Sequence, residues 1–239
     1  MEFGFLEYFL VAFIAIVAPV WGVIGHRQMM ERLANVPNAR IAGYRKTMMV
    51  EWIVVAIVLV VWLGGGERLA ALGLGFETGW AFWVFGGLTL VACVLSIVQA
   101  ITITRSEKKL ADVSEQLRSL APMVPHNDRE SQWWVGLSVT AGICEEIIYR
   151  GFMITTLAVL FGPWPAVGLS SLAFGLAHAY QGPKGVLKVF AIGLTMGALF
   201  VLSGSLWAPI VLHIVIDLAS GYLGRQAVAR VTAASPATV

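Results

Sequence analysis

The sequence predicts an all-α protein, a polytopic membrane bundle of about seven transmembrane helices, and two observations support this fold class. First, apolar residues make up 58% of the 239-residue chain and charged residues only 13%, against about 45–50% and about 25% in soluble domains. A soluble globule of this size cannot cover so much apolar side chain with polar surface. Second, the apolar residues gather in stretches close to the roughly 20 residues that a helix needs to cross a bilayer.

Seven apolar stretches are expected to be spans, and the fifth of them is short. They cover residues 8–25, 48–66, 80–104, a stretch that starts near 133, 166–180, 186–202 and 206–223. We expect one membrane domain over 1–239, in which 1–130 holds three spans and a cytoplasmic connector and 131–223 forms a core of four spans. Residues 226–239 are expected to form a disordered tail, because they lack a core-forming pattern.

The positive charges predict the orientation of the bundle. With seven spans, the Lys and Arg residues on one side are Arg27, Arg32, Arg40, Arg45, Lys46, Arg105, Lys108, Lys109, Arg118, Arg129, Lys184, Lys188, Arg225 and Arg230. Arg68 lies on the opposite side, and Arg150 lies within a span. Because cytoplasmic loops carry the excess of Lys and Arg, we expect the N-terminus outside and the C-terminus in the cytoplasm. An asymmetry this strong is typical of a prokaryotic cytoplasmic (inner) membrane.

The connector at 106–128 is the longest charged stretch between the predicted spans. It carries both signs of charge, and Leu110, Val113, Leu117 and Leu120 recur at helical spacing. An amphipathic helix on the cytoplasmic surface fits this pattern, and so does a solvated connector.

Ionisable side chains cost about 2.5–3.5 kcal/mol each at mid-bilayer on insertion scales, so they need partners there. The last four predicted spans contain Glu145, Glu146, Arg150, His178, His213 and Asp217. The first three spans contribute only Glu51, which we expect close to a cytoplasmic end where water reaches it. The C-terminal half is therefore where a functional site is expected.

Helical spacing indicates which of these side chains can meet. Glu146 and Arg150 are four residues apart and can form an ion pair along one helix face, either as a structural brace or as the frame of a site. Glu145 points about 100° away from Glu146 and has no local cation. His213 and Asp217 share a face, so the carboxylate can reach the ring. The simplest packing turns these spans toward one buried polar chamber.

A carboxylate and two histidines in one chamber suit hydrolysis. A carboxylate and an imidazole can take a proton from a shared water, and a second imidazole can donate to the oxyanion that forms. No G-x-S-x-G elbow or other nucleophile signature accompanies them. The same Glu, His, His and Asp set could instead hold a zinc ion with an activated water, although the motif H-E-x-x-H is absent.

Three motifs then carry a resemblance to a known family. EEIIYRGF matches the pattern E-E-x-x-x-R, FGLAH matches F-x-x-x-H, and HIVID matches H-x-x-x-N/D, in this order and each in a predicted span. The chain resembles the CAAX protease and bacteriocin-processing family, also called the Abi or type II CAAX prenyl endopeptidase family. The resemblance covers about residues 133–223 and implies an intramembrane endopeptidase whose chamber opens to the cytoplasm or the inner leaflet.

The resemblance also implies roles for individual residues. Glu145 would be the general base, His178 would share the catalytic water, and His213 with Asp217 would form the oxyanion-binding side. The residues implied to support this site are Glu146, Arg150 and Phe174. Many family members have Asn where this chain has Asp217. Asp217 therefore either carries a proton or accepts a hydrogen bond from His213 and orients that ring, and the four-residue spacing favours the second.

Cofactors and partners follow from the same resemblance. No cofactor is expected; if zinc is bound, Glu145, His178 and His213 would be its ligands. The expected partners are the lipid bilayer and a membrane-embedded or lipidated peptide or protein, such as a C-a-a-X protein or a bacteriocin leader. Nucleic acid is not expected, because a net charge of +2 provides no basic face.

Two other classes of protein stay open. A proton-coupled transporter also uses buried carboxylates and histidines, but it favours inverted repeats or paired broken helices, and the sequence shows neither. A non-catalytic immunity or scaffold protein could keep the same fold. Replacement of Glu145 by Gln distinguishes a scaffold from a peptidase, because a scaffold should keep its function after the change and a peptidase should lose it.

Overall fold

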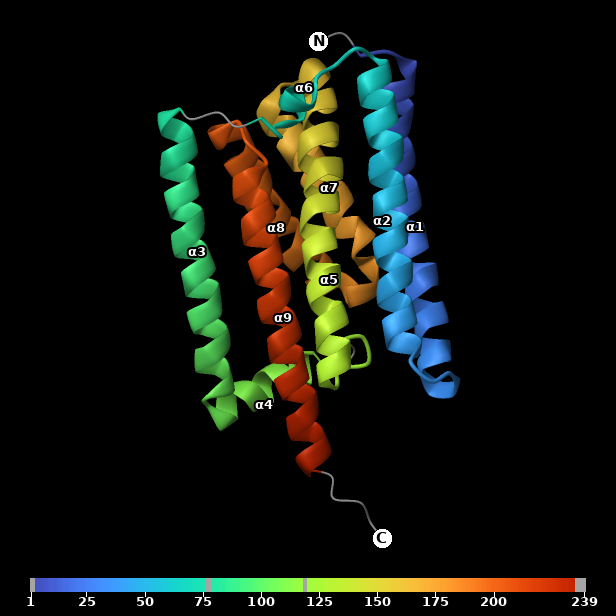
Figure 1. Ribbon diagram of the computed structural model, residues 1–239, viewed down its shortest axis with the longest axis vertical. Helices are drawn as coiled ribbons and strands as arrows, with labels where there is room; N and C mark the ends of the chain where they lie inside the picture. The colour runs from blue at the N-terminus through green and yellow to red at the C-terminus, as the bar shows by residue number, and fades with distance from the viewer. Residues whose placement is uncertain (1–2, 76–78, 118–119, 235–239) are drawn as a thin grey trace.

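The computed structural model describes residues 3–75, 79–117 and 120–234, and every regular element in these ranges is a helix (Figure 1). In chain order the elements are α1 (Phe5–Asn35), α2 (Ala39–Gly64), η1 (Leu69–Leu72), α3 (Trp80–Thr104), α4 (Glu107–Gln116), α5 (Asp128–Glu145), η2 (Glu146–Ile154), α6 (Thr155–Phe161), α7 (Pro163–Ala177), η3 (Ala179–Gln181), α8 (Gly182–Ser203) and α9 (Trp207–Ala234). The predicted all-α class is confirmed.

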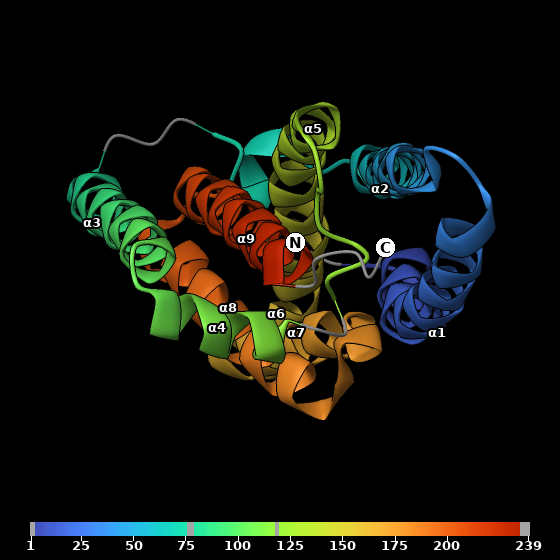
Figure 2. The same cartoon turned by 90° about the horizontal axis from the view of Figure 1, so that it is seen from below.

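The long helices run side by side as a bundle. Viewed along the bundle, α1 and α2 stand on one side and α3 on the other, with α5 and α9 between them (Figure 2). The turn between α1 and α2, helix α4 and the last turns of α9 all lie at one end, which is the lower end in Figure 1. That end carries most of the Lys and Arg residues on which the orientation was predicted.

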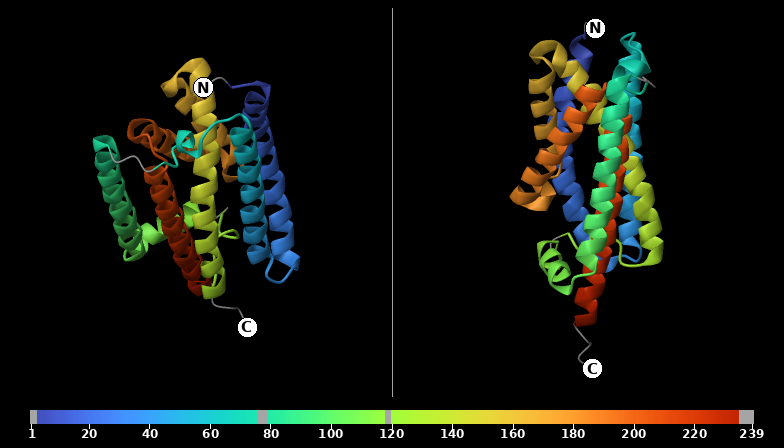
Figure 3. Two further views of the ribbon diagram at one scale, coloured as in Figure 1. Left: turned by 45° about the horizontal axis from the view of Figure 1, so that its top comes forward. Right: turned by 90° about the vertical axis from the view of Figure 1, so that its left-hand side faces the viewer.

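Within the described ranges, five helices are long and apolar enough to cross a membrane: α1, α2, α3, α9, and α8 together with η3. Helix α7 has 15 residues, which at 1.5 Å per residue span about 22 Å, less than the roughly 30 Å of a hydrocarbon core. The turn after α7 lies well short of the end that α1 and α9 reach (Figure 3). The fourth predicted span corresponds to α5 and its continuation through η2 and α6.

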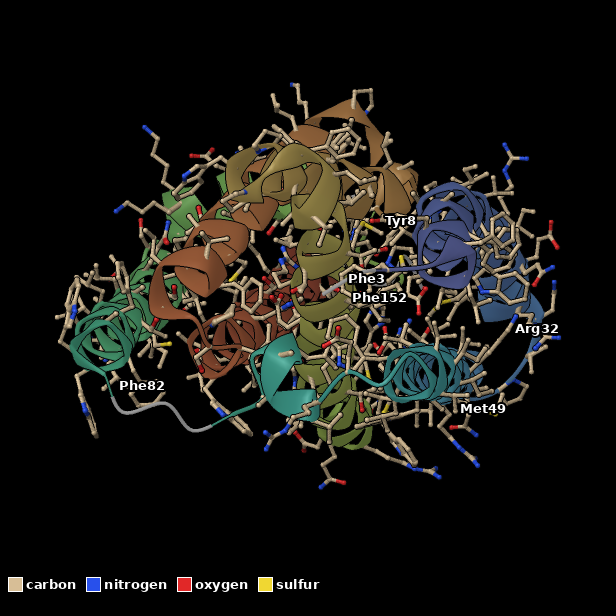
Figure 4. All side chains as sticks on the ribbon, turned by 90° about the horizontal axis from the view of Figure 1, so that it is seen from above. Phe3, Tyr8, Arg32, Met49, Phe82 and Phe152 are labelled. Atoms are coloured by element: carbon tan, nitrogen blue, oxygen red, sulfur yellow. The ribbon has the colours of Figure 1, made fainter. Side chains whose placement is uncertain are left out.

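The outer faces of the bundle are apolar, as a bilayer requires. The buried residues of α3 are Thr89, Cys93 and Ala100, while its large apolar side chains face outward. Figure 4 shows Phe82 of α3 at the rim of the molecule and Phe152 near its centre. Lipid tails are as apolar as a protein interior, so such exposure costs nothing in a membrane. The chain is an integral membrane protein.

The structure decides three expectations from the sequence, on the connector, the C-terminal tail and the position of Glu51. The connector contains a helix, α4, whose N-cap Ser106 accepts a hydrogen bond from the Lys109 N–H. The expected tail at 226–239 differs from the structure, because α9 continues to Ala234; residues 235–239 lie outside the described ranges. Helix α2 begins at Ala39, so Glu51 stands halfway along it and not close to an end as expected.

Helix α5 lies close against α9 at Gly142. A Cβ at this position would lie 2.5 Å from Cγ1 of Ile214 and 3.1 Å from the Ile214 backbone nitrogen. Only glycine therefore permits this separation. Gly142 stands one turn before Glu146, and Ile214 directly follows His213. The contact thus sets the distance between the two helices that carry these groups.

Replacement of Gly142 by Ala should separate α5 from α9. Overpacking of this kind costs about 1–3 kcal/mol, so the variant should melt at a lower temperature than the parent in detergent micelles. Gly136→Ala on the same helix is the matched control, because its new Cβ would meet only the flexible Met48 Sδ at 3.7 Å. Equal melting temperatures for the two variants would contradict the close approach.

Candidate active site

The site begins where α5 changes its winding. After Glu145 the helix continues as the π-helix η2, and all nine of its residues are buried. A π-helix turn contains an extra residue, so it shifts the side chains that follow it around the helix axis, and such turns are frequent at functional sites. Nothing in the periodicity of the sequence indicated this element.

Within η2, Glu146 and Arg150 form the ion pair that their spacing predicts. Nη1 of Arg150 donates to Oε1 of Glu146 at 2.9 Å, and the two side chains are 1% and 0% exposed. The Arg150 guanidinium also lies over the ring of Phe174, with Cζ 4.4 Å from the ring centroid. A cation over an aromatic face is attracted to its π electrons, so Phe174 helps to hold the pair in place.

His213 of α9 lies between the two adjacent glutamates. Its Nδ1 is 2.7 Å from Oε1 of Glu146, the oxygen that also accepts from Arg150. Its Nε2 is 3.6 Å from Oε2 of Glu145. Because a carboxylate oxygen accepts hydrogen bonds, Nδ1 carries a proton, and Nε2 is the nitrogen that faces the chamber. His213 is thereby fixed in tautomer and direction.

Asp217 does not take the orienting role that its spacing favoured. Its Oδ2 is 3.9 Å from Nε2 of His213, too far for a hydrogen bond, and Glu146 holds the other nitrogen of the ring instead. The side chain of Asp217 therefore lies beside the ring without bonding to it. Its backbone carbonyl accepts from Nε1 of Trp134 at 3.0 Å, which ties this turn of α9 to α5.

Exposure of these side chains increases along the bundle. The exposed fraction is 0% for Glu146, 9% for His213, 18% for Glu145 and 32% for Asp217. Along α9, the order from His213 to Asp217 runs toward the end where α4 lies (Figure 1). The site side chains are thus fully buried on the Arg150 side and increasingly exposed toward the basic end of the bundle.

His178 follows the last residue of α7 and is placed by Phe174. Its Nδ1 is 2.9 Å from the Phe174 carbonyl oxygen, which can only accept, so the ring donates from Nδ1 and its Nε2 is free to accept. The Phe174 ring centroid is 4.8 Å from that of His178 and 6.0 Å from that of His213. Phe174 thus contacts both histidines, and the structure gives no hydrogen bond between His178 and Glu145.

The three possible zinc ligands do not converge in this arrangement. Among the described residues, no group of three or more His, Cys, Asp and Glu side chains is placed to hold a metal ion. Nδ1 of His213 bonds Glu146 and Nδ1 of His178 bonds a carbonyl, so Nε2 is the ring nitrogen that each histidine has left for a ligand.

Glu51 is a further acidic residue near the site, although the sequence predicted it close to a cytoplasmic end of its span. Glu51 of α2 lies in electrostatic range of Glu145, Asp217 and His213. Its Oε2 is buried and has no hydrogen-bond partner among the described residues. A signal was available, because Glu51 recurs at helical spacing with the apolar residues that α2 buries.

A comparison with protein families identifies the segment that carries this site. The family model described as type II CAAX prenyl endopeptidase Rce1-like matches residues 129–219, from the first turn of α5 to α9. The match confirms the resemblance indicated by the three motifs, and at the level of the family it supports peptide hydrolysis. Comparisons with curated proteins and with solved structures give no significant match.

Removal of the Glu146 carboxylate should destabilise the protein strongly. Glu146→Ala leaves Arg150 buried without its counter-ion, and breaking such a pair costs about 3–5 kcal/mol. Glu145→Ala is the matched control on the neighbouring residue, since the Glu145 side chain is partly exposed and its ion pair with His213, at 3.6 Å, is long. Unfolding of both variants by SDS in mixed micelles measures the difference. Similar midpoints would show that the ion pair does not brace the bundle.

Proposed function

We propose that the protein is an intramembrane endopeptidase that hydrolyses a peptide bond of a membrane-associated peptide or protein with a water activated by glutamate and histidine. One observation carries the proposal: Glu145 lies 3.6 Å from Nε2 of His213, whose other nitrogen is held by the buried Glu146. A base and a fixed donor thus face one space. The family match supports the same class of reaction.

In the first step, Glu145 takes a proton from a water in the chamber, and the water oxygen attacks the carbonyl carbon of the peptide bond. His178 helps to orient this water, because its Nε2 accepts a hydrogen bond. The carbonyl electron pair moves to oxygen and forms an oxyanion. When the His213 ring carries both protons, it donates from Nδ1 to Glu146 and from Nε2 to this oxyanion. Such a donor is worth about 2.7–4 kcal/mol of transition-state stabilisation.

In the second step, the oxyanion reforms the carbonyl and the C–N bond breaks. The leaving nitrogen receives the proton that Glu145 took from the water, which restores the carboxylate. Asp217, 3.9 Å from Nε2, supports the positive charge on His213 without bonding to it. No covalent intermediate forms in this sequence.

The membrane arrangement belongs to the same proposal. We place the bundle with seven membrane segments, of which α7 is too short to cross the whole core. The N-terminus is outside and the C-terminus is in the cytoplasm of a prokaryotic cell, so that the more exposed side of the site faces the cytoplasm. The increase in exposure from Glu146 to Asp217 supports this direction. Candidate substrates are C-a-a-X-type proteins and leader or bacteriocin-type peptides.

Glu145→Gln should abolish cleavage while the protein accumulates normally, because Gln cannot take the proton from water. Membrane peptides from cells with the intact protein are compared by mass spectrometry with those from cells with the variant at matched expression. One or a few precursors should remain uncut in the variant, and the missing cut site identifies the substrate class. Glu107→Gln, an exposed change on α4, is the control. Identical profiles, combined with an effect of deleting the whole protein, would favour a scaffold.

Asp217→Asn should lower the rate of precursor cleavage by on the order of tenfold, corresponding to about 1.4 kcal/mol, and should not abolish it. The amide keeps the shape of the side chain but loses the charge that supports His213. The rate of precursor loss in isolated membranes measures the effect. Near-full activity would contradict a role of this charge, and a loss as complete as that of Glu145→Gln would indicate a direct contact with the reacting atoms.

A further inference from the structure

Residues 121–126, which we call the strap, lie between α4 and α5 at the basic end of the bundle. Figure 2, which views the bundle from this end, shows the strap passing between α9 on one side and α1 and α2 on the other before it joins α5. This is also the end toward which the site side chains become more exposed. The strap is therefore in a position to control what reaches the site.

Two hydrogen bonds from α2 hold the backbone of the strap. Nε of Arg40 donates to the Pro122 carbonyl at 2.8 Å. One residue further along the strap, the Tyr44 hydroxyl donates to the Met123 carbonyl at 2.5 Å. Arg40 is itself fixed by Glu130 of α5, with 2.7 Å between Nη1 and Oε1. Loss of either bond to the strap would loosen it from α2.

The next residue of the strap, Val124, packs against α9. Val124 is 7% exposed. A Cβ added at Gly224 of α9 would lie 2.6 Å from Cγ1 of Val124 and 2.8 Å from its Cβ, closer than two carbon atoms can approach. The contact therefore requires glycine at position 224, and a side chain there would push the strap and α9 apart.

On one side, Met123 is linked to His178 through two aromatic rings. Its Sδ is 3.2 Å from Nδ1 of His26 on α1. The His26 ring stacks on that of Tyr180 in η3, with 5.4 Å between the ring centroids. The Tyr180 ring centroid is in turn 5.8 Å from that of His178. Two rings therefore separate the tip of the strap from this histidine of the site.

On the other side, Met123 is linked to Asp217 in a similar way. Tyr44, which bonds the Met123 carbonyl, lies edge-on to Trp134 of α5, with 5.5 Å between the ring centroids. Nε1 of Trp134 donates to the Asp217 carbonyl at 3.0 Å. Met123 thus stands between the rings that lead to His178 and those that lead to Asp217. The strap lies across the approach to the site from the basic end.

A cavity of about 780 Å³ flanks the strap. Cavities that hold small ligands are of the same order, roughly 300–1,000 Å³. The side chain of Met123 lies against His26, on the side of the site. The walls of the cavity belong to α1, α4, α9 and four strap residues, namely Ala121, Pro122, Val124 and His126. The strap therefore has the site on one side and room to move into on the other.

Water and a peptide chain differ in the room that they need. With the strap in place, the Asp217 side chain is 32% exposed, so water can reach the site. A peptide chain is wider, because neighbouring strands of a sheet lie about 4.8 Å apart even where the backbones are closest. A barrier at this position can therefore pass water and stop a polypeptide.

We infer that the strap is a gate for the site. In the position described, it admits water and excludes a polypeptide from the basic end of the bundle. A polypeptide reaches the site after the strap has moved toward the flanking cavity. The inference goes beyond the proposed function and does not depend on it, because access to the site can be measured without turnover.

A reporter thiol tests the gate on the full-length protein in nanodiscs. Asp217→Cys places the thiol at the site, and Glu107→Cys places it on the exposed face of α4 as a reference. The two native cysteines, Cys93 and Cys144, which are buried and free, are replaced by Ala in both proteins. Each protein reacts with methyl methanethiosulfonate and, separately, with a methanethiosulfonate that carries a bulky sulforhodamine group. The ratio of the two rate constants at the site, relative to that at the reference, measures exclusion.

The bulky reagent should be excluded from the site by at least about tenfold, because its rate is scaled by the fraction of molecules in which the strap has moved away. Tyr44→Phe removes the bond to Met123 and should raise the bulky rate about two- to tenfold, the range expected for one net hydrogen bond. Gly224→Ala should also raise it, because its Cβ displaces Val124. Gly25→Ala on α1 is the control and should change nothing, since its Cβ would meet no atom within 4 Å.

Three results would overturn the inference. Equal ratios at the site and at the reference would show that the site is not gated. Exclusion that persists in both Tyr44→Phe and Gly224→Ala would show that the strap is not the gate. A release as large in Gly25→Ala would show that any disturbance loosens the bundle. If Gly224→Ala fails to fold, Tyr44→Phe decides alone, because it removes one oxygen atom and keeps the ring.

Discussion

A single carboxylate oxygen holds the site together. Oε1 of Glu146 accepts from Nη1 of Arg150 at 2.9 Å and lies 2.7 Å from Nδ1 of His213, so it connects η2 with α9. Loss of Glu146 would leave the Arg150 cation buried without its counter-ion. The Arg150 guanidinium lies over the Phe174 ring, and that ring in turn contacts the ring of His178. The geometry of both histidines thus depends on Glu146.

Part of this site was accessible from sequence, for a simple physical reason. Charges within apolar stretches must be paired, and spacing of four residues identified the pair Glu146 and Arg150 without any coordinates. Spacing could not show that Glu146 also bonds His213, because that contact joins two helices. The spacing therefore predicted that Asp217, on the same helix, orients His213. In the structure the Asp217 carboxylate lies too far from the ring to bond it.

The two other differences have related causes. The π-helix adds a residue to each turn and so changes which side chains share a face after Glu145, whereas sequence periodicity assumes an α-helix throughout. Glu51 was placed near an end because hydropathy located the start of its span at residue 48, while the helix begins at Ala39. Hydropathy measures apolar content, and a helix can begin well before that content rises.

The graded exposure of the chamber has a consequence for the cell. Acidic and basic groups that line a path through a membrane can pass protons along it and so dissipate the electrochemical gradient. Here the exposed fraction decreases from 32% at Asp217 to 0% at Glu146, and the layer behind Glu146 is a fully buried turn closed by a fixed guanidinium. In the proposed orientation, protons and water would be exchanged with one side of the membrane only. A protein built in this way would keep acid–base chemistry inside a bilayer without becoming a proton leak.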